Sequence, residues 1–402
     1  MRCPLVAWML AALMLATAPC LAAPEVTIGA IYPQAANRSR AAVSTAVAVV
    51  NEKHSPILLL MGAGGGLNRL DNATLRAADG TADDPAQAEA EAERLVTAER
   101  VVALVGGGPP LVSAAIRRVA TRHAIPYLAL DLGPPAGDGL TWGFALAPTD
   151  ATVSAALFQF LRDQGPAIGR DIKTLGLVYE DTPAVVALSD VQRRLADDAG
   201  LKRVVQLNLR PDAPGLATEV ETIVEQKPDA VIATLGAGNA IRLVRDLADR
   251  RALPLWLGQG SGCADPAFAT GLGPAADGVF CTTGFVPDAV VARPGLPALG
   301  AAFQARTGSA LDAEAAGVMT TVLLIADVID RAGSTKPLDL RIALMATDAP
   351  GDKLPMAWRG IRFDDSGQNV LAEPAIGQVQ GGAYRVVAPD EVATAKPAWP
   401  VK

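Results

Sequence analysis

Histidine is scarce in this chain: the 402 residues include only two, His54 and His123. Each lies near the end of a predicted helix, where the helix dipole stabilises a partly charged imidazole, so we expect structural roles for both. So few histidines also argue against a zinc site. Asp79, Asp83 and Asp84 form an acidic cluster without the spacing of a calcium loop, and a turn before a helix explains it. We therefore expect no bound metal.

Hydrolase and nucleotide-binding motifs are also lacking. Ser261 lies between two glycines, but a nucleophile elbow needs further glycines where Gln259 and Cys263 stand. No phosphate loop ending in Gly-Lys-Ser/Thr occurs. Residues 236–241 join a predicted strand to a helix, yet Ile241 stands where a dinucleotide site has its third glycine. We therefore expect no cofactor and no enzymatic activity.

The sequence has no excess of basic residues. Its formal net charge is −7 and it contains no long basic run, so we do not expect nucleic acid as a partner. Half of the chain is hydrophobic, at 50%, and this is enough to fill the cores of two domains.

No hydrophobic run is long enough to span a bilayer. Residues 1–23 contain Arg2, an apolar stretch at 5–18 and small residues at 21–23, which is typical of a cleaved secretory signal peptide. The next most apolar run, at 318–328, is also too short for a membrane span. An uncleaved N-terminal anchor is the alternative. We expect an exported, periplasmic protein.

Cysteine is rare, with four in the chain. Cys3 and Cys20 would leave with the signal peptide, whereas Cys263 and Cys281 would remain in a compartment that permits disulfides. Cys263 opens a loop after one predicted strand, and Cys281 lies in the next strand. A disulfide between them and two separate buried thiols both fit the sequence.

The most informative segment that is present covers residues 101–130. Residues 101–105 are an apolar run, typical of a strand buried on both faces. Three glycines and two prolines follow, and proline fits the first turn of the helix that comes next. A second buried strand is predicted at 125–130. This unit brings backbone N–H groups to the C-terminal edge of a parallel sheet, where open α/β sheets bind small ligands.

Similar units follow one another along the chain in two series. Strands are predicted at 26–32, 73–78, 101–105, 125–130, 174–179, 203–209, 230–235, 254–257 and 278–283. Helices are predicted at 41–51, 83–99, 110–123, 151–163, 183–199, 216–226, 240–251, 296–307, 315–331 and 337–345. Extended segments at 360–363, 375–380 and 384–387 add a small antiparallel tail. The alternation predicts an α/β fold with two Rossmann-like lobes and parallel central sheets.

The loops after the predicted strands form the candidate binding site. In a two-lobed α/β protein such loops converge on one cleft, and here they offer backbone donors, amides, hydroxyls and aromatic rings. That set suits reversible binding of a small molecule better than bond-making. Ordinary βα loops without a ligand are the alternative. The candidate ligand-binding residues are Tyr32, Asn37, Gly107, Gly108, Pro109, Asp131, Leu132, Gly133, Tyr179, Asp181, Gly236, Gly238, Gln259, Ser261 and Phe285.

The order of these segments resembles the solute-binding proteins of ABC importers, in the leucine/isoleucine/valine-binding family with the type I periplasmic binding fold. The resemblance rests on VTIGAIYP, VVALVGGG, IPYLALD, TLGLVYEDTP, PDAVIATLG, LWLGQGS and DGVFCTTGF, in this order. It implies two lobes that close like a hinge on a ligand. Three crossings would join the lobes, near 147–149, 283–286 and 357–363. The first lobe would comprise 24–147 and 285–357, and the second 148–284 and 358–402.

The resemblance also implies roles for the candidate residues. Tyr32, Tyr179 and Phe285 would pack against the ligand. The backbone of the loops at 106–108 and 131–133 would hold its polar end. The side chains that close from the second lobe would be Asp181, Gln259 and Ser261.

Two departures from the family pattern bear on the ligand. Family members that bind α-amino acids have small hydroxyl residues after the third strand, where residues 107–109 read Gly-Gly-Pro. They also have an acid for the ligand's ammonium in the loop at 258–261, which here contains no carboxylate. A buried ammonium without an anion is costly. We therefore expect a small amino-acid-like solute, or an apolar carboxylate or amide such as an aliphatic amide or an aromatic acid, in the cleft between the lobes, and not a standard branched-chain amino acid.

The partner that the resemblance implies is an ABC permease at the membrane, approached by a monomeric binding protein. Two other functions stay open at this point. The same fold would also serve as a sensory module that reports ligand occupancy to a membrane receptor. An exported enzyme on an α/β scaffold is the third.

Overall fold

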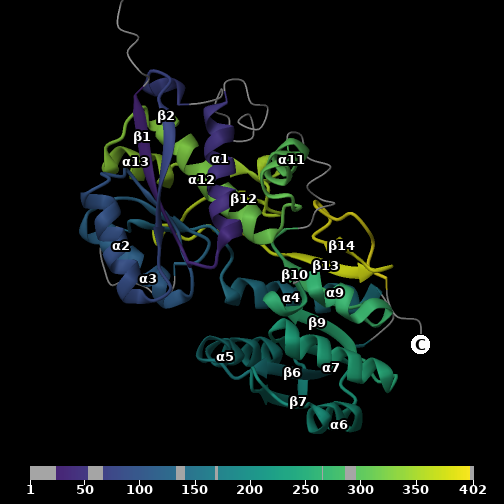
Figure 1. The fold of residues 1–402 in the computed structure, drawn as a ribbon. Coiled ribbons are helices and arrows are strands. Elements are labelled where there is room, and N and C mark those ends of the chain that lie inside the picture. Colours follow the sequence, from purple (N-terminus) through teal and green to yellow (C-terminus); the bar gives the residue numbers. More distant parts are fainter. Residues whose placement is uncertain are drawn as a thin grey trace, which may run out of the picture.

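The computed structural model describes residues 24–52, 67–132, 141–167, 171–264, 266–285 and 296–398. The predictions for the signal peptide, His54 and Gly133 lie outside this part of the chain. Two large sheets form the framework, and helices cover both faces of each (Figure 1). The predicted α/β class is thereby confirmed.

The first sheet is parallel and has the strand order β2-β1-β3-β4-β5. Its strands are β1 (Glu25–Tyr32), β2 (Thr74–Thr81), β3 (Leu104–Gly106), β4 (Tyr127–Ala129) and β5 (Gly143–Ala145). One face packs against α1 (Asn37–Asn51), α11 (Leu296–Thr307), α12 (Ala313–Ala332) and α13 (Pro337–Met345). The other face packs against α2 (Pro85–Thr97) and α3 (Pro110–Arg122).

Helix α12 fills the centre of the first core. Every residue from Ala315 to Asp330 is buried. Asp312 caps its start by accepting a hydrogen bond from the Ala315 amide at 2.9 Å, and Gly333 ends it in the left-handed conformation. The apolar run at 318–328 is therefore a core helix, and the described part of the chain contains no helix that would reach across a membrane.

The second sheet has the order β14-β13-β10-β9-β8-β6-β7, and only its β10-β13 and β13-β14 pairs are antiparallel. Its strands are β6 (Thr174–Glu180), β7 (Lys202–Leu209), β8 (Ala230–Thr234), β9 (Leu255–Gln259), β10 (Phe280–Thr283), β13 (Ala375–Gln380) and β14 (Ala383–Ala388). One face packs against α4 (Asp150–Ala167) and α5 (Pro183–Asp198). The other packs against α6 (Ala217–Gln226), α7 (Ala237–Asp249) and α9 (Pro266–Leu272).

The chain passes between the sheets at three places. Residues 147–149 lead from β5 to α4, and the chain leaves β10 after Thr283 to return to the first core. The third crossing is predicted at 357–363, but Trp358, Ile361 and Phe363 are apolar and pack in the first core. The packing therefore favours a third crossing just before β13, so residues 358–372 belong with the first lobe and not the second.

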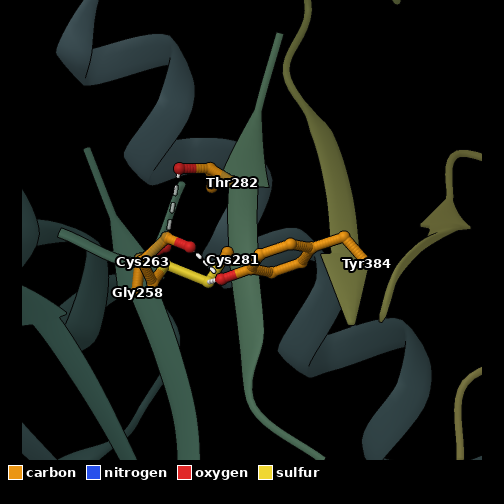
Figure 2. The surroundings of a disulfide bond; sticks show 5 residues. All are labelled: Gly258, Cys263, Cys281, Thr282 and Tyr384. Carbon is orange, nitrogen blue, oxygen red and sulfur yellow. Dashed lines mark hydrogen bonds between the residues drawn. A yellow bond between two sulfur atoms is a disulfide. The ribbon is translucent and has the colours of Figure 1, made fainter. Parts of the chain in front are cut away.

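A disulfide lies in the second lobe, next to Gly258, Thr282 and Tyr384, as Figure 2 shows. Cys263 of α8 (Ser261–Ala264) and Cys281 of β10 are bonded, with their Cα atoms 5.9 Å apart. The Tyr384 hydroxyl donates to the carbonyl of Cys263. A Cβ at Gly258 would lie 2.2 Å from the Cys263 sulfur, so only glycine leaves room for the bond. Of the two states that the sequence allows, the structure has the bonded one.

Candidate functional site

A cavity of about 240 Å³ lies at the C-terminal edge of the first sheet. The loops after β1, β3 and β4 form one side of it, and the first turns of α12 form the other. Its lining residues are Tyr32, Pro33, Ala36, Ser39, Gly106, Gly107, Gly108, Ser113, Leu130, Asp131, Glu314, Val318 and Thr321. Ligands bind at this edge in open α/β sheets, because the strand ends leave loops and helix N-termini there.

The glycine loop after β3 approaches its neighbours too closely for a side chain. Gly106 has a φ of +127°, and a Cβ there would lie 2.0 Å from the carbonyl oxygen of Ile31. The Gly107 amide donates to that same oxygen at 2.9 Å. The Gly108 amide faces the Ser113 hydroxyl at 3.3 Å. The Gly107 N–H is therefore not free to hold a ligand, contrary to the role expected for it.

Ser113 supplies a hydroxyl that the sequence argument missed. It lies one turn into α3, is buried at 1% exposure and lines the cavity. Residues 107–109 carry no hydroxyl, but Ser113 brings one to the same loop. The reason is that the helix begins at Pro110 and turns Ser113 back over Gly108.

Glu314 brings a carboxylate to the cavity from the first turn of α12. The Ser39 hydroxyl, on α1 and only 1% exposed, donates to its Oε1. Tyr32 lies beside them at 8% exposure. Burial raises the pKa of Tyr32, and electrostatic interactions with Tyr127 and Glu314 raise this pKa further. The phenol therefore stays protonated and is available as a donor.

Asp131 is a second carboxylate in the lining, directly after β4 and Leu130. Desolvation raises the pKa of Asp150 at the start of α4, and the charge of Asp131 raises this pKa further. The nearby cationic side chain is Arg117. Burial lowers the pKa of its guanidinium, whereas electrostatic interactions with Tyr127 and Asp131 raise this pKa. The edge of the first sheet thus carries several carboxylates near one partly buried arginine.

Gln259, a predicted ligand residue, is held inside the second lobe at 2% exposure. Its Oε1 accepts hydrogen bonds from the Ser154 hydroxyl at 2.8 Å and from Gln192 Nε2 at 2.9 Å. Its Nε2 donates to the Asp150 carbonyl at 3.1 Å. Gln192 also donates to the Thr234 hydroxyl at 3.2 Å. Gln259 therefore joins β9 to the helices that cover the sheet.

The two other aromatic candidates are core residues. Tyr179 is fully buried in the core beneath α4 and α5, where burial raises the pKa of its hydroxyl to about 12. Phe285 is 7% exposed and packs in the first core. Neither is among the residues that line the described cavity.

The structure brings four of the predicted residues together in the cavity: Tyr32, Gly107, Gly108 and Asp131. Leu132 packs in the core beside α3. Gly108 and Asp131 are exposed, as are the predicted residues outside the cavity lining at Asn37, Pro109, Asp181 and Gly238. Gly236 lies against the Glu180 carboxylate, and Ser261 begins α8. Among the described residues, no group of three or more His, Cys, Asp and Glu side chains is arranged to hold a metal.

Two α/β lobes joined by several crossings, with a small cavity at the edge of a parallel sheet, define a binding protein for small solutes. Comparison with known families gives the particular family. Residues 25–383 match the model of the periplasmic binding proteins, and the chain belongs to this family.

Several relatives are similar over nearly their whole length. The Leu/Ile/Val-binding protein homolog 8 of Brucella suis biovar 1 (strain 1330) is 26% identical over 398 residues, which cover 94% of each chain. The Leu/Ile/Val-binding protein homolog 7 of Brucella abortus (strain 2308) is 24% identical, over 97% of each chain.

Solved structures agree in fold. A protein of Silicibacter pomeroyi described as a branched-chain amino acid ABC transporter has a TM-score of 0.76 at 15% identity, covering 94% of this chain and 99% of that one. The substrate binding protein LivJ of Streptococcus pneumoniae, solved in complex with isoleucine, has a TM-score of 0.67 at 16% identity, covering 90% and 97%.

Proposed function

We propose that this protein is the substrate-binding component of an ABC importer and holds one small solute at the edge of its first sheet. The observation that carries this proposal is the cavity of about 240 Å³, bounded by three strand-end loops and by α12. Pockets for drug-sized ligands measure about 300–1,000 Å³. The cavity therefore suits a solute of roughly amino-acid size.

The solute would be released unchanged. Members of this family bind solutes, and relatives of similar length are named for leucine, isoleucine and valine. The second lobe would close over the occupied cavity by rotation about the three crossings. A permease in the membrane would then recognise the closed form. Export to the periplasm, through cleavage of the N-terminal segment, belongs to the same proposal.

A thermal-shift and calorimetry panel tests solute binding. The panel contains amino acids, their amides, their decarboxylated amines and their deaminated acids. A ligand at 100 times its Kd should stabilise the protein by about 2.7 kcal/mol. Recovery of the solute unaltered after incubation is the expected result. Chemical conversion of the solute, or no stabilisation by any member of the panel, would contradict the proposal.

Uptake by cells tests the assignment to an importer. Cells that lack this chain should take up the labelled solute more slowly than cells that have it. Full uptake without the chain, together with an altered transcriptional response to the solute, would favour the sensory module instead.

A further inference from the structure

The charged side chains that line the cavity are both acidic. Among the lining residues, Glu314 and Asp131 are carboxylates, and none is lysine or arginine. Arg117 interacts electrostatically with Asp131 but is not part of the lining. Asp150, at the start of α4, also interacts with Asp131. The charged groups of the lining are therefore both anionic, and both side chains, Glu314 and Asp131, are also exposed to solvent.

The same cavity has few free backbone donors for a carboxylate group of a ligand. The Gly107 amide is already bonded to the Ile31 carbonyl, and the Gly108 amide faces Ser113. Pro109 has no amide hydrogen at all. An anionic group placed against this loop would also meet the negative charges of Glu314 and Asp131. Burying such a group without compensating donors is costly.

From this arrangement we propose that the cavity binds an ammonium group, with the Glu314 carboxylate as its main partner and Asp131 as the second counter-charge. The inference rests on the proposed function and names its substrate class. That class is small organic amines with an apolar body, for which a carboxylate on the ligand is not required. It replaces the neutral or acidic solute expected from the sequence.

Glu314 is held in place for this role. The buried Ser39 hydroxyl donates to one of its oxygens, and within the described part of the chain no hydrogen bond engages the other. Glu314 lies in the first turn of α12, at the positive end of the helix dipole. Tyr32 is 8% exposed and lines the same cavity, and burial raises the pKa of its phenol, which stays protonated and can donate a hydrogen bond.

Apolar side chains complete the cavity. Val318, on the next turn of α12, and Leu130, at the end of β4, lie beside the acids in the lining. A short alkyl chain attached to the ammonium would pack against them. Thr321 donates its hydroxyl to the Gly317 carbonyl within the helix, so it does not compete for the ligand.

Calorimetry with three probes of nearly equal shape tests the inference. The probes are 3-methylbutylamine, which is leucine without its carboxylate, 4-methylpentanoate, which is leucine without its ammonium, and leucine itself. We expect the amine to bind within about tenfold of leucine, and the acid to show no heat of binding at the same concentrations.

Variants assign the effect to the cavity. Glu314→Gln keeps the size of the side chain and removes its charge, so the affinity for the amine should fall at least tenfold. Ser39→Ala, which frees the carboxylate to rotate, should weaken binding by a smaller factor. Glu225→Gln changes an exposed glutamate of α6 in the other lobe and should leave the affinity unchanged. Circular dichroism and the melting temperature of each variant establish that it is folded.

The outcomes separate this inference from the proposed function. Binding of 4-methylpentanoate without the amine would overturn the inference and leave the proposed function in place, as would amine binding that Glu314→Gln does not weaken. Failure of all three probes while a neutral amide binds would have the same meaning. Failure of the entire solute panel on folded protein would overturn both.

Discussion

Gly106 shows how one backbone position shapes the cavity edge. Its φ of +127° belongs to a region that side chains rarely adopt, and a Cβ there would lie 2.0 Å from the Ile31 carbonyl oxygen. Because β1 and β3 are neighbours in the sheet, neither strand can move aside without losing pairing. The glycine run that follows β3 in the sequence is thus explained by close packing of backbone against backbone.

Gly106→Ala should therefore be strongly destabilising. We expect a loss of about 1–3 kcal/mol in the free energy of unfolding, because strain at such a position is not relieved locally. Urea denaturation measures it. Gly238→Ala is the matched control, since Gly238 lies in α7 with no atom within 4 Å of the added Cβ. The control should be neutral or slightly stabilising. Equal stability of the two variants would contradict this account.

Asp327 gives a pH dependence with a definite sign. Burial raises the pKa of this carboxyl, although Arg331, whose Nε lies 2.6 Å from it, acts in the opposite direction. The folded state thus binds the proton more tightly than the unfolded state does. The stabilising contribution of this group is complete below the ordinary aspartate pKa of about 4 and is lost as the pH rises through the raised folded value.

Asp327→Asn removes that titration. The free energy of unfolding of the wild type, relative to the variant, should decrease as the pH rises from about 4 towards neutrality. Urea midpoints of both proteins across this range give the difference. A difference that does not change with pH, or that increases with it, would show that the burial of Asp327 does not control its pKa.

At the scale of elements, the helices of the second lobe are joined through one buried polar cluster. Gln259 of β9 bonds to Ser154 of α4 and Gln192 of α5, and Gln192 bonds to Thr234 of β8. These four side chains are each less than 8% exposed. Their bonds fix how α4 and α5 lie on the sheet, and α4 is the first helix after the crossing at 147–149.

Gln259→Leu should cost about 1–3 kcal/mol, because Ser154 and Gln192 lose their partner in a dry environment. Gln206→Leu, at an exposed position of β7, is the control. If Gln259 is structural, the variant should keep its ligand affinity within a few-fold when measured well below its melting temperature. Loss of binding with unchanged stability would instead support the ligand contact expected from the sequence.

Most helices and strands could be predicted because their apolar residues recur periodically and because glycine or proline marks many of their ends. The bounds predicted for α11, α13 and β13 are those observed. Strand β5 was missed, since Gly143–Ala145 is three residues long and shows no alternation of its own. It is a strand because it pairs with β4, and its Ala145 pairs with Gln368 in a distant part of the chain.

In the whole molecule, the first crossing between the lobes is hydrogen-bonded to the segment that precedes β13. The Asn369 amide donates to the carbonyls of Leu146 and Gly360, both at 3.1 Å, and Gln368 Nε2 donates to the Ala147 carbonyl at 2.8 Å. Asn369 Oδ1 also accepts from the Arg362 amide at 3.0 Å. A side chain that is 2% exposed thus connects the first crossing to the segment before β13.

Asn369→Ala should destabilise the protein by about 1–3 kcal/mol, because several buried backbone groups lose their partners. Asn208→Ala, on the exposed side of β7, is the control. Since the change lies next to two crossings, ligand binding should also alter the small-angle scattering profile by a different amount than in the wild type. An identical change in both proteins would argue against a role for Asn369 in hinge closure.

The sequence by itself determined the order of strands and helices, the two-lobed α/β class and the family, because these depend on local periodicity and on motifs read along the chain. It also located the glycine loop, since proline and glycine act on their own backbone. The charge of the cavity was decided only by tertiary structure. Ser39 and Glu314 are 275 positions apart and meet because α1 and α12 pack in one core. No local pattern marks that meeting, so the sequence did not predict that Glu314 would line the cavity.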